Sequence, residues 1–277
     1  MLPAPACRSQ RSKFRALAKS TARAQTGSVP SSFDHYSLLT LALTVFVAGV
    51  AGLARGFSGF GAALIFMPAG SALVGPAVAA PVLLVADGVL SLGFLPRAWG
   101  LARRRDVALM ASGAVIGVPL GAYVLRHADP LLLRWVIAGL ASSMLLLLLS
   151  GWRYHGTPRA PVTAVVGAVA GLFGGLAQMT GPPVVAYWLS GKETHGTMRA
   201  SIILFFGATT IFTFISYLAS GIITTQSLWL AALVAPAYAL GLFTGSRAFH
   251  LARPEVFRRL CFVLIAASVL TSLPVWR

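Results

Sequence analysis

The chain has 277 residues, of which 57% are hydrophobic and only 10% are charged. A soluble domain could not keep that much apolar surface away from water, so the composition excludes a soluble protein and indicates an integral membrane protein. The formal net charge of +16 would suggest nucleic acid in a soluble protein, but here Lys and Arg lie mainly in loops beside anionic lipid headgroups. We therefore expect lipids and an anionic substrate as partners, and no nucleic acid.

Residues 1–34 form a basic tail that we expect to be disordered and exclude from the fold. Its first 33 residues have six Lys or Arg, no acid and many Ser and Ala. This pattern fits a disordered tail, an organellar transit peptide or a misplaced start codon, and no signal-peptide core follows Met1 directly. The two cysteines, Cys7 and Cys261, give neither a disulfide framework nor metal-ligand spacing. We expect no metal and no cofactor.

Apolar segments separated by short loops follow from Ser37 onward, and their Leu and Ala content favours helices over the alternating strands of a barrel. At roughly 20 apolar residues per crossing, the sequence predicts an all-α polytopic membrane protein with full spans and two longer, glycine-broken regions. In chain order these are the broken region 37–73, the spans 76–95, 107–125 and 131–150, the broken region 162–190, and the spans 200–219, 228–249 and 260–276.

Each broken region is interrupted near its middle, by GFSGFG at 56–61 and by QMTGPP at 178–183. Gly and Pro punctuate regular structure, so we expect a pair of short helices or a re-entrant hairpin at each break. Glycine pairs four residues apart, at 117 and 121 and at 241 and 245, predict close helix packing. Tyr187 and Trp188, near a span end, are typical of interface anchors.

The two halves of the chain resemble each other, which indicates a duplicated unit. AGLARGFSGFG at 51 aligns with AGLFGGLAQMTG at 170, and GVPLGAYVLRHADP at 117 aligns with GLFTGSRAFHLARP at 241. Equivalent loops have opposite charge bias, which under the positive-inside rule predicts inverted repeats. We expect repeat 1 over 35–155 and repeat 2 over 156–277 within one membrane domain. The basic loop with Arg97 and Arg103 would then lie inside, and the basic tail outside, against the same rule.

The two breaks are the candidate substrate site. Inverted repeats with discontinuous helices at equivalent positions are typical of secondary transporters that bind substrate near the membrane midplane. Helix N-termini at the breaks direct unpaired N–H groups into the cavity, and glycine lets an oxyanion approach the backbone, so the geometry favours an anion. An alternative is that the polar side chains at the breaks only satisfy backbone groups that Gly and Pro set free. The candidate contacts are Ser58, Gly59, Gly61, Gln178, Thr180 and Gly181.

Arg55 and Asp87 are the charged residues expected at the site. Arg55 lies three residues before Ser58 and would neutralise a bound anion with directional N–H donors. Its alternative role is a side chain that snorkels to the membrane face. Asp87 lies midway along an apolar span, where it would carry a coupling proton, pair with Arg55, or act as a static partner for another cation or a helix terminus.

The glycine motifs resemble those of the sulfite exporter TauE/SafE family of membrane permeases. GLFGGLAQMTGPPVVAYWL at 171–189 has the family's pattern of glycines followed by two prolines, and GFSGFGAALIFMP at 56–68 is similar, with Ala62 and Ala63 where a further glycine is common. The resemblance covers the chain from about Ser37 to the C-terminus. It implies transport of sulfite, sulfonates or related small organic anions across the bacterial inner membrane, frequently outward, and leaves a homodimer open.

Two other functions compete with a permease. GFSG at 56–59 resembles the nucleophile motif of rhomboid proteases, but none of the five histidines lies well inside an apolar segment where it could activate Ser58. An anion channel leaves no motif that distinguishes it from a carrier. Because GxxxxGK[ST] is absent from the sequence, direct ATP drive is not expected. The sequence therefore predicts a non-enzymatic permease that works by alternating access, driven by a proton or potential gradient.

Overall fold

The computed structural model describes residues 36–59, 61–93, 95–151, 159–188, 195–251 and 254–273. The basic tail 1–34 and the end of the last predicted span, 274–276, lie outside the described residues. Every element in the described part of the chain is an α-helix, and the residues from Leu38 onward form one compact unit. The predicted all-α fold is confirmed.

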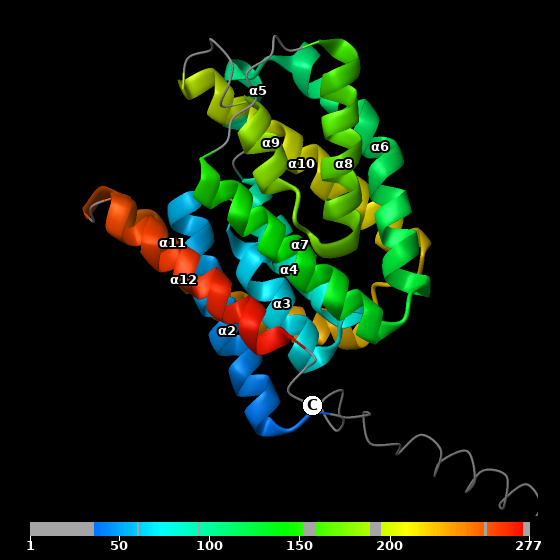
Figure 1. Ribbon diagram of the computed structural model, residues 1–277, viewed down its shortest axis with the longest axis vertical. Helices are drawn as coiled ribbons and strands as arrows, with labels where there is room; N and C mark the ends of the chain where they lie inside the picture. The colour runs from blue at the N-terminus through cyan, green and yellow to red at the C-terminus, as the bar shows by residue number, and fades with distance from the viewer. Residues whose placement is uncertain are drawn as a thin grey trace, which may run out of the picture. The chain divides into compact units, whose positions relative to one another are not determined.

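The helices follow the order that the apolar segments predict (Figure 1). α7 begins at Pro130 behind Asp129, whose carboxylate accepts from the backbone N–H of Leu131 at 2.8 Å. In chain order the helices are α2 (Leu38–Ser58), α3 (Ala62–Val74), α4 (Pro76–Leu92), α5 (Leu95–Leu101), α6 (Arg104–His127), α7 (Pro130–Ser150), α8 (Ala160–Ala177), α9 (Gly181–Trp188), α10 (His195–Ala219), α11 (Thr225–Leu251) and α12 (Pro254–Ser272).

Six helices of the described chain are long and apolar enough to cross a membrane: α2, α6, α7, α8, α10 and α11. α4 and α5 form a bent pair that would make a seventh span if it is counted as one. α3 and the Arg259–Ser272 part of α12 are apolar but shorter. Large apolar side chains such as Ile116 and Leu240 are exposed on these helices, as lipid-facing residues must be. The chain is a multi-pass membrane protein.

Each glycine-broken region consists of one long and one short helix. α2 has 21 residues and is followed by α3 with 13, while α8 has 18 residues and is followed by α9 with 8. The helix before each break is long enough to span the bilayer by itself, because the apolar run that precedes the glycines is about as long as a full crossing. Each break therefore lies at the end of a spanning helix, and the short helices α3 and α9 begin just after it.

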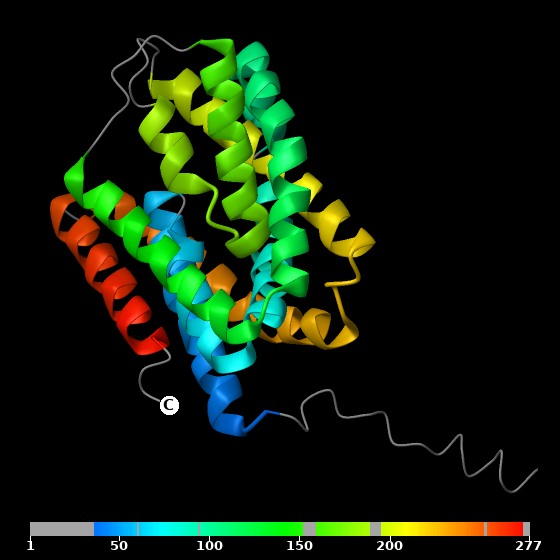
Figure 2. The same ribbon diagram turned by 45° about the vertical axis from the view of Figure 1, so that its right-hand side comes forward.

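Two helix pairs pack at backbone contact through glycine. α2 packs against α11, and α6 lies along α8 (Figure 2). A Cβ atom at Gly117 would lie 2.8 Å from the backbone nitrogen of Leu172, and one at Gly245 would lie 2.9 Å from the carbonyl carbon of Leu53. Only glycine allows such an approach, which supplies dense van der Waals contact between membrane helices. The packing role predicted for both glycine pairs is confirmed.

These pairs connect the two predicted repeats to each other. α2 and α8 hold equivalent places in 35–155 and 156–277, and each packs most closely against a helix of the other repeat, α11 and α6 respectively. A duplicated unit whose copies interlock gives this reciprocal pairing. The boundary between the repeats and their opposite orientation in the membrane stay predictions.

Candidate functional site

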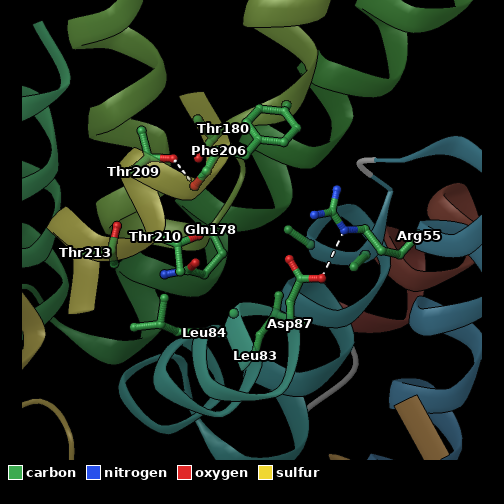
Figure 3. Close-up of a pocket in the computed structure, with 14 residues that line it drawn as sticks. Arg55, Leu83, Leu84, Asp87, Gln178, Thr180, Phe206, Thr209, Thr210 and Thr213 are labelled. Atoms are coloured by element: carbon green, nitrogen blue, oxygen red, sulfur yellow. Dashed lines mark hydrogen bonds and ion pairs between the residues drawn. The ribbon is translucent and has the colours of Figure 1, made fainter. Parts of the chain in front are cut away.

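A cavity of about 50 Å³ lies where the two breaks meet α4 and α10 (Figure 3). Arg55 and Asp87 form one wall, and a group of threonines forms the wall that faces them. Apolar side chains and the starts of both short helices complete the lining. The lining residues are Arg55 of α2, Ala62 and Ala63 of α3, Leu83, Leu84, Asp87 and Gly88 of α4, Gln178, Thr180 and Gly181 of the second break, and Phe206, Thr209, Thr210 and Thr213 of α10.

The backbone ends both long helices in the same way. Gly59 after α2 has φ +83°, and Gln178 after α8 has φ +58°. These left-handed residues stop the helix and turn the chain. At Gln178 the turn is closed by its own N–H, which donates to the carbonyl of Gly174 at 2.9 Å. Because α3 and α9 start immediately after these turns, their first residues, Ala62 and Gly181, lie at the cavity and direct helix N-termini at it.

Arg55 and Asp87 form a partly buried ion pair. Nε of Arg55 donates to Oδ1 of Asp87 at 3.0 Å, with the side chains 14% and 26% exposed. Nη2 of Arg55 donates to Ser91 at 3.2 Å, and the guanidinium carbon lies 5.8 Å from the ring centre of Phe206. Arg55 therefore points into the protein and is not a snorkelling side chain. Of the roles left open for Asp87, pairing with Arg55 is the one that the structure shows.

Tyr238 joins the ion pair from the second half of the chain. Its hydroxyl, on α11, donates to Oδ1 of Asp87 at 2.7 Å, and its side chain is fully buried. Ser91 also donates to Oδ1, at 3.4 Å. The protein's hydrogen bonds to this carboxylate thus converge on a single oxygen, and among the described residues none reaches Oδ2.

The opposite wall presents hydroxyl groups that make no hydrogen bond to any described residue. These belong to Thr180, Thr210 and Thr213, and Thr213 is only 2% exposed. Thr209 differs, because its hydroxyl donates to the carbonyl of Phe206 at 3.0 Å. Thr180 and Thr210 are half-buried, and Thr213 is buried. The three hydroxyls can therefore donate to, or accept from, whatever fills the cavity.

The structure brings together Arg55, Asp87, Gln178, Thr180 and Gly181 of the predicted site. Gln178 is held in place by Tyr217, to whose hydroxyl its Nε2 donates at 3.3 Å, and Tyr217 in turn donates to the carbonyl of Gly175 at 2.7 Å. The side chain of Gln178 is thereby fixed at the rim of the second break.

Ser58, Gly59 and Gly61 are not among the residues that line the cavity. The hydroxyl of Ser58 donates to the carbonyl of Ala54 at 2.7 Å and accepts from the N–H of Gly61 at 3.1 Å. Ser58 therefore bridges the break, which is the backbone role that the sequence left open as the alternative. A function in substrate contact for these three residues stays a prediction.

Several site residues escaped the sequence analysis. Tyr238, Ser91 and Phe206 have no distinguishing pattern, because each lies in an apolar span. The threonines at 209, 210 and 213 are spaced to share one helix face inside an apolar segment, and this spacing is a usable signal. Tyr187, expected at the membrane interface, is instead 3% exposed, and its hydroxyl lies 2.6 Å from that of Thr163.

Comparison with known proteins agrees with this architecture. The family model described as sulfite exporter TauE/SafE matches residues 44–271, which include both breaks and the whole cavity lining. Neither the curated proteins nor the solved structures contain a match. The model covers well over half of the chain, so the protein belongs to the sulfite exporter TauE/SafE family of membrane transporters.

Proposed function

We propose that the protein is a secondary permease for a small anion, sulfite or a compact organosulfonate, which it exports across the bacterial inner membrane by alternating access. The observation that carries this proposal is the composition of one cavity. A guanidinium, three threonine hydroxyls and two helix N-termini offer donors or positive charge to it, and the one carboxylate in its lining, Asp87, is paired with the guanidinium.

Arg55 is the group that selects for negative charge. Its guanidinium presents N–H donors in a fixed planar fork, which matches the oxygens of a sulfite or sulfonate group. A charged residue among membrane helices is costly and is retained mainly where it has a function. Thr180, Thr210 and Thr213 face Arg55 across the cavity (Figure 3), so an oxyanion between them would satisfy both walls.

The size of the cavity favours a compact substrate. Since a cavity needs ~10–15 Å³ of such volume to hold one water, the cavity of about 50 Å³ has room for a few water-sized groups. Sulfite has one sulfur and three oxygens and fits this space. Leu83, Leu84 and Phe206 close the apolar sides, and a sulfonate with a long chain would need them to move.

The position of the cavity supports alternating access. It lies between elements of both predicted repeats, with α2, α3 and α4 from the first and the α8–α9 break and α10 from the second. In transporters built from repeats, rocking of one half against the other opens such a site to each side in turn. Each half here supplies a different part of the site, the ion pair from one and the hydroxyl groups from the other.

The test is counterflow of radiolabelled sulfite in proteoliposomes that contain the full chain and an excess of unlabelled sulfite. A carrier with its site in this cavity accumulates label transiently, and Arg55→Ala abolishes the accumulation while the protein still inserts. Arg104→Ala is the matched control, because Arg104 is exposed and lies over Trp99 at 5.3 Å, away from the lining. Equal counterflow in wild type and Arg55→Ala would remove Arg55 from the site, and leak without counterflow would indicate a channel.

A further inference from the structure

The ion pair at the cavity poses a conflict for anion binding. The guanidinium of Arg55 already donates to Asp87 at 3.0 Å, so its positive charge is balanced before any substrate arrives. An anion that contacts Arg55 must share it with the carboxylate or displace it. Two negative charges on one partly buried cation would leave one of them uncompensated, which is strongly unfavourable in a membrane protein.

We propose that Asp87 takes up a proton when the anion takes its place on Arg55, so that one proton moves with each anion and in the same direction. This inference rests on the proposed function. The proton enters on Oδ2 of Asp87 and forms an O–H bond there, and the bond between Arg55 and Oδ1 gives way to one between Arg55 and a substrate oxygen. On the other side of the membrane both steps reverse.

The geometry of the carboxylate supports this assignment. Arg55, Ser91 and Tyr238 all donate to Oδ1, and Oδ2 makes no hydrogen bond to a described residue. Oδ2 lies on the side of the carboxylate away from Arg55, toward the cavity (Figure 3). A proton can therefore be added from the cavity without breaking any bond that the protein makes to Asp87.

Within the described part of the chain, Asp87 forms an ion pair with Arg55 and with no other cation. Arg55 faces it from α2 and Tyr238 faces it from α11, while α10 contributes the ring of Phe206 and threonine hydroxyls. Among the described residues, the other helices packed on α4 place no charged side chain in an ion pair with Asp87; Arg103 and Asp106 form the remaining pair, at 3.4 Å on α6. Arg55 is therefore the cation with which Asp87 pairs.

Tyr238 acts as a positioning residue in this scheme. Its hydroxyl donates to Oδ1 at 2.7 Å, and Oδ1 keeps an acceptor lone pair when Oδ2 carries the proton. Asp87 therefore stays in place after Arg55 has left it. Because Tyr238 belongs to α11 and Asp87 to α4, the same bond ties the site to both predicted repeats.

Two measurable properties follow from one-to-one coupling. Transport of a monovalent anion with one proton is electroneutral, so a pH gradient drives accumulation and a membrane potential does not. Apparent affinity for the anion is highest where Asp87 is protonated, and above that range it falls by up to about tenfold for each unit of pH. Export is then driven by the concentration gradient of the anion, and it must overcome the inward gradient of protons.

The experiment uses radiolabelled methanesulfonate, which is monovalent and does not titrate in the working pH range, in proteoliposomes with a trapped pH dye. With the potential clamped by potassium and valinomycin, an acidic exterior should drive accumulation with one proton taken up per methanesulfonate, and an imposed potential should change nothing. Asp87→Asn should lose proton uptake and acquire a voltage-dependent flux. Asp106→Asn, a matched change at the exposed ion pair, should behave as wild type.

The outcomes separate the coupling from the permease itself. Methanesulfonate exchange in wild type without proton uptake would overturn the coupling and leave the permease standing, and so would proton uptake that persists in Asp87→Asn. Absence of exchange for both methanesulfonate and sulfite would remove the proposed function and the coupling with it. If Asp87→Asn fails to insert, the proton-to-anion ratio of the wild type decides by itself.

Discussion

Replacing Tyr238 with Phe removes the hydroxyl that donates to Asp87 and keeps the aromatic ring. The hydroxyl is fully buried and donates to Oδ1 at 2.7 Å, while the ring that packs between α11 and α4 is kept. This donor holds Asp87 in place when the anion takes its position on Arg55. Without it the carboxyl group is no longer fixed at the cavity wall, so the initial rate of methanesulfonate uptake should fall.

The size of the effect follows from the bond. A hydrogen bond to a charged group contributes about 1.5–3 kcal/mol, and each ~1.4 kcal/mol corresponds to a tenfold change in rate. The initial rate should therefore fall by roughly one to two orders of magnitude. Ser91 donates to the same oxygen at a longer 3.4 Å, so it offsets only a small part of the loss.

The assay is the initial rate of methanesulfonate uptake in proteoliposomes, measured across pH at clamped potential. Tyr187→Phe is the matched control, since Tyr187 is equally buried but its hydroxyl pairs with Thr163 outside the cavity. The control should have the wild-type rate. An unchanged rate in Tyr238→Phe would refute the reasoning that this hydroxyl holds the coupling carboxylate in place.

Three other changes give distinct results. Arg55→Lys keeps the charge but cannot reach both Asp87 and Ser91 as the guanidinium does, so the apparent KM for sulfite should rise roughly tenfold or more; equal KM values would show that charge alone suffices. Phe206→Ala opens one side of the cavity and should raise uptake of benzenesulfonate relative to methanesulfonate, whereas an unchanged ratio would mean that this ring does not limit substrate size. Gly117→Ala places a Cβ 2.8 Å from the nitrogen of Leu172 and should lower thermal stability in detergent, by about 1–3 kcal/mol, while Gly139→Ala, where nothing lies within 4 Å, should not.

The sequence predicted the helical fold, and several of the residues that line the cavity, because both depend on local composition. Long apolar runs must be helical in a bilayer, and glycine with proline marks a break wherever it occurs in them. Arg55 and Asp87 stood out for the same reason, since a charge in an apolar run is visible without any tertiary information. The reciprocal pairing of α2 with α11 and of α6 with α8 follows from glycine spacing once the partners are known.

The finer content of the site depended on tertiary contacts that no spacing reveals. Tyr238 lies 151 residues from Asp87 in sequence, and a tyrosine in an apolar span looks like any other core residue. Ser58 was a natural candidate because it lies among glycines, yet its hydroxyl closes the turn of its own break. Polar residues at a break serve either the backbone or the cavity, and only the three-dimensional arrangement distinguishes these roles.

The most direct test of the account is the crystal structure of the purified protein with selenite, the selenium analogue of sulfite, located by its anomalous scattering. We expect selenium between Arg55 and the hydroxyls of Thr180, Thr210 and Thr213, with a substrate oxygen on the guanidinium in place of Oδ1 of Asp87. Selenium at a different place in the protein, or in the cavity with the Arg55–Asp87 bond of 3.0 Å intact, would contradict the claim that the anion and Asp87 exchange on Arg55.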